Sequence, residues 1–462
     1  MENQRLALRE QLLFKTSVDR FSVSCGDIRR RLSREFAKAD EARRADLLDT
    51  LAELTIDLQS YLIRWHLQDP KAMERLSDDE LAKAVDENMA LLKKWGCEKA
   101  LEHVKAEVES IRRSSLARLS ATSDRGEINT RWGNDYPLGL TRTLRRGAIL
   151  VTTNPPLVNI ARKEEPKVWD AVRDELRRRH PGASADRLVS LLTMRVVLRN
   201  CRELRPIYEV SGRRLGYVNL QVNPKNATHP EAMIAEAEFL YEEMKRELKG
   251  RPNVVFKLPG TKEALPAAAH LTAKGIGVSI TLGFAVDQHL AFAEVIERGT
   301  AELSFVVMMT GRLDDPIREE LATGGMPDAA ETARWASTAV IRRSYDLLYR
   351  QRKYRRSALL VASLRGPWAI EAALTDEEAP IYVTAFPDKA AEYDAGERCI
   401  VSCIRESLPE KIMSRLRKSR LFAQAYDVGG LTPAGFGEFL PVQKTQDAFV
   451  SAWKELDAYV QA

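Results

Sequence analysis

The sequence predicts an α/β protein: a (β/α)8 TIM barrel with an all-helical N-terminal extension and helical insertions. From about residue 127 onward, short apolar runs alternate with amphipathic stretches, as in a parallel sheet whose strands are joined by helices. Residues 1 to about 120 show only three- and four-residue apolar spacing, which is typical of helices. We therefore expect a helical region over residues 1–122 and the barrel over residues 123–462.

In the N-terminal region, apolar residues recur at helical spacing and form stripes along predicted helices. One face of a predicted helix gathers large apolar side chains, at Leu47, Leu51, Leu54, Leu58, Tyr61 and Trp65. Such a stripe usually packs in a core. A separate helical bundle, a cap on the barrel and a module for homo-oligomerisation are all compatible with this pattern.

Eight candidate strands follow in chain order. They are expected at 127–131, 148–151, 217–222, 254–258, 277–282, 303–308, 358–362 and 381–385. Amphipathic stretches between them supply the helices, for example 231–248. Two helical insertions are expected at about 166–206 and 388–430, and a last helix over 445–460 is expected to pack over the barrel.

Composition excludes several functional classes. The 71 basic and 66 acidic residues leave a net charge of only +5, which gives little support for a nucleic-acid partner. The basic run 352–356 is interpreted as the solvated face of a helix. No apolar stretch reaches the ~18 residues that span a bilayer, and the first residues are polar, so a cytoplasmic protein without membrane contact is expected. Five cysteines and six histidines lack metal-ligand spacing, so neither a metal nor a cofactor is expected.

Lys257 is the most informative residue of the chain. It ends the apolar run Val254–Phe256 and is followed by Pro259 and Gly260, so it is expected at the end of a buried strand. A lysine carried into a core is costly unless its charge is paired or lost. A desolvated amine with a lowered pKa is what Schiff-base chemistry on a ketone requires. The alternative is that Lys257 reaches water or a carboxylate from the strand end.

A second segment supports a functional role for this lysine. The run 148–151 breaks into Thr-Thr-Asn-Pro-Pro at 152–156, and 277–282 forms a further strand beyond Lys257. With the Lys-Leu-Pro at 257–259, these segments make residues 125 to 462 resemble the transaldolase family. That resemblance implies a barrel in which Lys257 forms the Schiff base and Asp135 is the acid/base of carbon–carbon cleavage.

The resemblance implies further site residues. Asn154, with Thr153 beside it, would bind the hydroxyls of a ketose, and Thr281 would position a catalytic water. After the sixth and seventh strands, Arg312 and the pair Ser363 and Arg365 would bind the phosphate of a phosphorylated sugar, since guanidinium groups suit a phosphate dianion.

The chain departs from the family pattern at three positions. Gln221 stands where transaldolases carry a glutamate that relays the proton, and in this it resembles fructose-6-phosphate aldolase. Glutamine cannot accept that proton but can orient a water. Met309 stands where the aldolase has a tyrosine, and Val307 where transaldolases have a serine.

Three functions therefore remain open. The first is a transaldolase-like enzyme that transfers a three-carbon ketol unit from a ketose phosphate to an aldehyde, with a substrate altered from the standard one. The second is an aldolase, or lyase, of the fructose-6-phosphate aldolase type. The third is a non-catalytic protein that binds a phosphosugar. The joint presence of Lys257, Asp135, Asn154 and Thr281 favours an enzyme.

Overall fold

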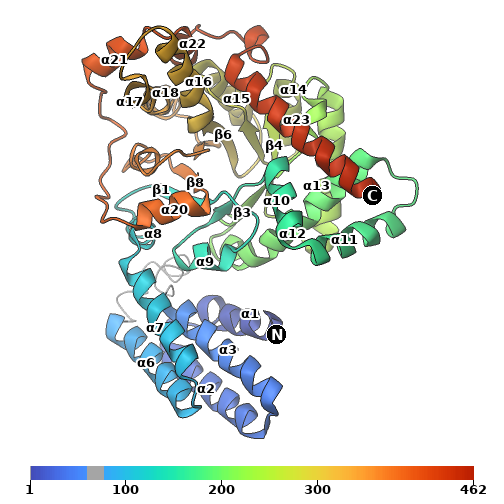
Figure 1. Cartoon of the computed structure of the whole chain (residues 1–462), viewed down its shortest axis with the longest axis vertical. Helices are drawn as coiled ribbons and strands as arrows, with labels where there is room; N and C mark the ends of the chain where they lie inside the picture. The colour runs from blue at the N-terminus through green and yellow to red at the C-terminus, as the bar shows by residue number, and fades with distance from the viewer. Residues whose placement is uncertain (1, 60–76) are drawn as a thin grey trace.

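The computed structural model describes residues 2–59 and 77–462 and contains a closed barrel of eight parallel strands (Figure 1). Each strand pairs with its neighbours in chain order, and β8 closes the barrel against β1. The strands are β1 (Thr130–Asn134), β2 (Leu150–Val151), β3 (Tyr217–Gln221), β4 (Val254–Pro259), β5 (Val278–Thr281), β6 (Ser304–Met309), β7 (Ser357–Ala362) and β8 (Ile381–Ala385). The predicted (β/α)8 barrel is confirmed.

Helices surround the barrel and connect its strands. They are α9 (Leu140–Arg145), α10 (Pro155–Glu164), α11 (Pro166–Arg179), α12 (Ala185–Val210), α13 (Pro230–Glu247), α14 (Ala264–Ala273), α15 (Val286–Glu297), α16 (Thr310–Thr323), α17 (Ala329–Ala333), α18 (Ala336–Tyr345), α19 (Trp368–Glu371), α20 (Pro387–Asp394), α21 (Glu410–Leu416), α22 (Arg420–Tyr426) and α23 (Leu440–Gln461). The long α12 packs against β3 and α23, so much of the stretch expected as an insertion at 166–206 covers the barrel itself.

The first strand lies later than the sequence indicates. It was expected at 127–131, but pairing with β8 begins only at Thr130 and continues to Asn134. Gly133 lies within this strand, where a Cβ atom would come 2.4 Å from the carbonyl oxygen of Leu150 on β2. Glycine is common in turns, but Gly133 is needed inside this strand because the neighbouring backbone leaves no room for a side chain.

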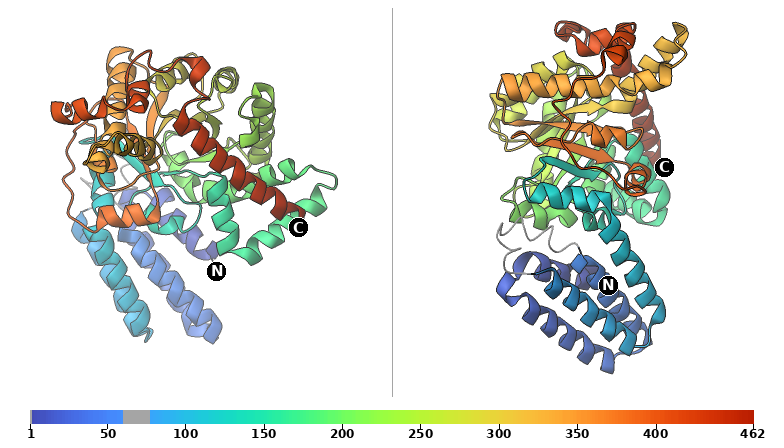
Figure 2. Two further views of the ribbon diagram at one scale, coloured as in Figure 1. Left: turned by 45° about the horizontal axis from the view of Figure 1, so that its top comes forward. Right: turned by 90° about the vertical axis from the view of Figure 1, so that its left-hand side faces the viewer.

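The N-terminal helices form a bundle beside the barrel (Figures 1 and 2). They are α1 (Glu2–Glu10), α2 (Phe21–Lys38), α3 (Glu41–Gln59), α6 (Asp78–Lys94) and α7 (Glu98–Arg113). Helix α8 (Ser115–Asp124) follows α7 and packs against β1 and α20 of the barrel. Leu47, Leu51, Leu54 and Leu58 are buried in a hydrophobic cluster separate from that of the barrel. The stripe residues Tyr61 and Trp65 lie outside the described residues.

The C-terminal helix α23 crosses the barrel (Figure 1). It contacts α10, α12 and α16, and Asn159 of α10 donates a hydrogen bond to the carbonyl oxygen of Ala452 on α23. In the described part of the chain, no helix combines the length and the apolar character needed to cross a bilayer.

Candidate active site

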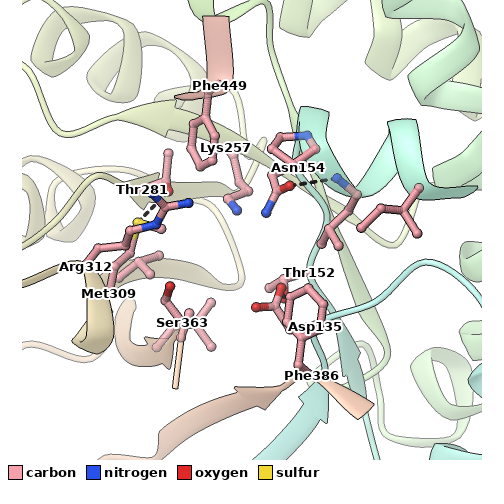
Figure 3. Close-up of a pocket in the computed structure, with 16 residues that line it drawn as sticks. Asp135, Thr152, Asn154, Lys257, Thr281, Met309, Arg312, Ser363, Phe386 and Phe449 are labelled. Atoms are coloured by element: carbon pink, nitrogen blue, oxygen red, sulfur yellow. Dashed lines mark hydrogen bonds between the residues drawn. The ribbon is translucent and has the colours of Figure 1, made fainter. Parts of the chain in front are cut away.

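A cavity of about 130 Å³ lies where the strands end (Figure 3). In barrels of this type the carboxyl ends of the strands carry the functional groups. Residues from these ends and from three helices line the cavity: Asp135, Thr152, Asn154, Pro156, Leu157, Ile160, Lys257, Thr281, Val307, Met309, Arg312, Leu360, Ala362, Ser363, Phe386 and Phe449. The wall therefore combines an amine, a carboxylate, hydroxyls and a guanidinium with apolar side chains.

Lys257 brings its amine into the cavity from β4. The side chain is buried, and Nζ donates a 3.0 Å hydrogen bond to the carbonyl oxygen of Thr153. Burial lowers the pKa of Lys257 to about 8, although the negative charge of Asp135 acts in the opposite direction. With this pKa, about one amine in ten is neutral at pH 7, against fewer than about one in a thousand for an ordinary lysine. The amine is thus prepared for nucleophilic attack.

Asp135 follows β1 directly and is the carboxylate of the cavity. Its backbone N–H donates to the carbonyl oxygen of Ala385 on β8 at 2.9 Å, which holds the residue against the barrel. Burial raises the pKa of the carboxyl group, and the charge of Lys257 and a hydrogen bond from Thr152 oppose that rise. The hydroxyl of Thr152 donates to Oδ1 at 2.6 Å. A carboxylate in this setting can take up and return a proton.

Asn154 is oriented by the helix that follows it. As the N-cap of α10, its Oδ1 accepts a 3.0 Å hydrogen bond from the backbone N–H of Leu157. Its amide nitrogen therefore points into the cavity, toward the end of Lys257 (Figure 3). An amide donor at this place suits a hydroxyl or carbonyl oxygen of a ligand.

Thr152, and not Thr153, presents its hydroxyl to the cavity. The hydroxyl of Thr153 donates to the carbonyl oxygen of Asn219 on β3 at 2.7 Å, and the side chain is fully buried away from the lining. Thr153 acts on the site through its carbonyl group, which accepts the hydrogen bond from Lys257.

Thr281 and Met309 lie together on the β5–β6 side. The hydroxyl of Thr281 donates a hydrogen bond to Sδ of Met309 at 3.5 Å, and Val307 lines the cavity beside them. The loop ends behind them are held by Gln288, which donates to the carbonyl oxygens of Gly260 and Leu282 at 2.7 and 3.0 Å. These bonds tie the ends of β4 and β5 to one buried side chain.

Gln221 lies beside Lys257 in the register of β3 and β4. It is buried and is not one of the residues that line the cavity. Among the described residues its Oε1 has no hydrogen-bond partner, and the same holds for Oγ of Ser279, the neighbour of Lys257 on β5. Two polar acceptors thus flank the lysine inside the barrel.

The cationic end of the cavity is formed by Arg312 and Ser363. Arg312 lies at the start of α16. Its side chain forms no hydrogen bond or ion pair with the described residues, and burial lowers the pKa of its guanidinium. Arg365 lies outside the lining, where its Nη2 donates to Oδ2 of Asp315 at 2.7 Å and its side chain is 42 % exposed. The structure therefore brings Arg312 and Ser363 into the cavity and leaves Arg365 next to it.

Several lining residues were absent from the sequence-based set, among them Thr152, Phe386 and Phe449. Thr152 differs from Thr153 only in the direction of its side chain, which depends on the strand register. Phe386 follows β8, where the alternation of strands and helices could have indicated it. Phe449 comes from α23, nearly 200 residues after Lys257, and no local pattern indicates that it reaches the cavity.

The barrel sequence is similar to sequences of known proteins. Residues 140–412 fit the family described as Transaldolase/Fructose-6-phosphate aldolase. The chain belongs to this family. The matched range includes seven of the eight strands, and it excludes the N-terminal helices, Asp135 and α23.

Individual relatives match over part of their length. The chain is 32 % identical over 207 residues to Transaldolase 1 of Streptomyces avermitilis, covering 42 % of this chain and 53 % of the relative. It is 28 % identical over 270 residues to a transaldolase of Parafrankia sp., covering 55 % and 70 %. It is 42 % identical over 99 residues to Transaldolase 2 of Nostoc punctiforme, covering 21 % and 25 %. The chain thus spans about half the length of the first of these transaldolase-family proteins.

Proposed function

We propose that this transaldolase-family protein is an enzyme that forms a Schiff base between Lys257 and a phosphorylated ketose and transfers a three-carbon ketol unit to an aldehyde. The observation that carries the proposal is the buried amine of Lys257, with a pKa of about 8, in one cavity with a carboxylate. Binding alone would not require an amine prepared for attack. The family of the relatives supports the same class of chemistry.

The reaction begins at Lys257. Its neutral Nζ attacks the ketone carbon. The ketone oxygen takes one proton from the amine and one from solvent and leaves as water, and a protonated imine forms. Asp135 then takes the proton of the hydroxyl on the carbon beyond the scissile bond. That bond breaks, its electron pair moves into the imine to give an enamine, and an aldehyde leaves. The amide of Asn154 is placed to bind a substrate oxygen near the amine (Figure 3).

The enamine has two fates. In transfer, it attacks the carbonyl carbon of an acceptor aldehyde, Asp135 returns its proton to the new alkoxide, and water hydrolyses the imine. In the aldolase route, the enamine carbon takes up the proton that Asp135 removed from the substrate hydroxyl, and water hydrolyses the resulting imine and releases a three-carbon ketone without an acceptor. Gln221 beside Lys257 supports this second route as the alternative function, because at this position the chain resembles fructose-6-phosphate aldolase and lacks the glutamate of the transaldolases.

We assign binding of the substrate phosphate to Arg312 and Ser363. A guanidinium that forms no ion pair with the described residues and a hydroxyl at one end of the cavity suit a dianion. The wall of Val307, Met309 and Leu360 between the two ends is apolar, which supports a substrate other than the standard one.

The test is borohydride trapping followed by mass spectrometry of the intact protein and its peptides, with a panel of phosphorylated and free ketoses. A three-carbon adduct on Lys257 supports cleavage chemistry, and an absolute need for an acceptor aldehyde in turnover supports transfer. Turnover without an acceptor supports the aldolase. Lys257→Ala must remove the adduct. A folded protein that binds a phosphosugar and gives no adduct would leave the binding protein as the function.

A further inference from the structure

Helix α9 lies between the N-terminal helices and the barrel (Figure 1). It contacts α3 of the helical region on one side and α12 and β1 of the barrel on the other. The segment 136–139 connects Asp135 to its first residue, and Gly139, with a φ of 65°, makes the turn into the helix. A displacement of α9 would therefore be transmitted to Asp135 over a short stretch of chain.

Arg145 ends α9 and binds two acidic residues of α3. Its Nε donates to Oδ1 of Asp57 at 2.9 Å, and its Nη2 donates to Oε2 and to the carbonyl oxygen of Glu53 at 2.8 and 3.1 Å. The side chain of Arg145 is 7 % exposed and that of Asp57 is 2 % exposed. Buried charges of this kind require their partners, so the contact resists separation of α9 from α3.

The other end of this connection is the loop that carries Asp135. Asn200 of α12 donates to the carbonyl oxygen of Pro137 at 3.1 Å, and the hydroxyl of Tyr136 donates to Glu164 of α10. The segment 136–139 contains no helix or strand, so its position depends on such contacts and on α9. Lys257 lies within the ladders of β4 with β3 and β5, whereas Asp135 is joined to the barrel by one backbone bond to Ala385 and by the hydroxyl of Thr152.

We propose that Arg145 is a positioning residue for Asp135: by its ion pairs with Asp57 and Glu53 it docks α9 on the N-terminal helices and so sets the place of the carboxylate. The proposal rests on the proposed function, because it gives proton transfer to Asp135. The helix that supplies both acidic partners lies outside the range 140–412 that matches the family. The N-terminal region thereby becomes a structural component of the candidate active site.

The two chemical steps allow a direct test. Imine formation needs Lys257, whereas carbon–carbon cleavage also needs Asp135, so borohydride traps a whole-sugar adduct before cleavage and a three-carbon adduct after it. In Arg145→Met we expect the ratio of three-carbon to whole-sugar adduct to fall about tenfold, with kcat falling by a similar factor and KM changing less than about twofold. The ratio is measured on trapped enzyme and does not depend on the folded fraction.

Two further variants support the test. Arg145→Lys keeps one charged contact, so its ratio of three-carbon to whole-sugar adduct is expected to lie between those of Arg145→Met and the wild type. If Arg145→Met does not fold, Arg145→Lys is used in its place. Combining Asp57→Asn with Arg145→Met should lower the ratio little more than Arg145→Met alone, since Asp57 is one of the two acidic partners that Arg145→Met has already released.

A matched control is Arg29→Met, which removes a contact with Asn88 at 3.2 Å and an ion pair with Glu87 inside the N-terminal helices. An unchanged adduct ratio in Arg29→Met supports a specific role of Arg145. The proposal is overturned if both adducts of Arg145→Met fall in parallel, or if Arg29→Met lowers the ratio equally. Absence of any adduct in the wild-type protein would instead refute the proposed function itself.

Discussion

The hydroxyl of Thr152 donates a 2.6 Å hydrogen bond to Oδ1 of Asp135. This bond stabilises the charged form of a carboxylate whose pKa is raised by burial. It connects the residue that follows β2 to the residue that follows β1, and it keeps the second oxygen of Asp135 available to a substrate. The protonation of Asp135 therefore depends on a residue that follows the neighbouring strand.

Replacing Thr152 by valine should raise the pKa of Asp135 further. The hydrogen bond from Thr152 stabilises the charged carboxylate, so its loss raises the pKa. Because the base must be ionised, the acid limb of the pH–rate profile of cleavage should move to higher pH. Thr153→Val is the control: its hydroxyl binds Asn219, so the acid limb should stay in place. An unmoved limb in Thr152→Val would contradict this role.

Replacing Lys257 by methionine should abolish turnover and yet stabilise the fold. The folded-state pKa of about 8 is below the ordinary value of 10.5, so below pH 8 the folded state holds a proton that it disfavours. That cost is about 3 kcal/mol at pH 7, and about 1 kcal/mol is recovered by the hydrogen bond to Thr153, so a gain of about 2 kcal/mol is expected. Urea unfolding measures it.

The stability difference between Lys257→Met and the wild type has a defined pH dependence. Between about pH 8 and 10.5 the unfolded wild-type chain binds more protons than the folded one, so wild-type stability rises there and the gain from methionine shrinks. Lys167→Met, at an exposed position of α11, should change stability by less than about 0.5 kcal/mol at any pH. A difference independent of pH would show that packing, and not charge, causes the gain.

Arg312 and Arg365 should contribute unequally to phosphate binding. Arg312→Met should raise KM for a phosphorylated ketose about 30-fold or more, since charge-assisted bonds to a buried ligand are worth about 2–3 kcal/mol. KM for the unphosphorylated ketose should change little. Arg365→Met should have an effect below about fivefold, because Arg365 is half-exposed and paired with Asp315. Equal effects of the two variants would mean that Arg365 turns into the cavity when substrate binds.

Phe449→Ala should make the enamine accessible to water. Phe449 closes the cavity from α23 and is buried, so its loss is expected to destabilise the fold by about 3–5 kcal/mol and to increase hydrolytic release relative to transfer. Product analysis with a fixed acceptor concentration measures this partition. Phe422→Ala, an equally buried position in α22 that does not line the cavity, should lose similar stability without changing the partition.

Much of the candidate site could be predicted from the sequence because strand ends are marked locally. A run of three apolar residues followed by Lys257 and Pro259 locates the amine, and the segment Thr152–Pro156 locates a strand end and a helix start. Gly133 shows the limit of such patterns: its meaning as a strand residue depends on the closeness of Leu150, which belongs to another strand.

The sequence by itself determined the barrel, the helical N-terminal region, the family resemblance and the position of Lys257 in a buried strand. Each of these follows from local periodicity or a short motif. Only the tertiary structure decided that Thr152 contacts Asp135, that Arg365 binds Asp315, that Phe449 closes the cavity and that Arg145 reaches Asp57. These contacts join residues distant in the chain, and their geometry is set by strand register and helix packing, which local sequence does not encode.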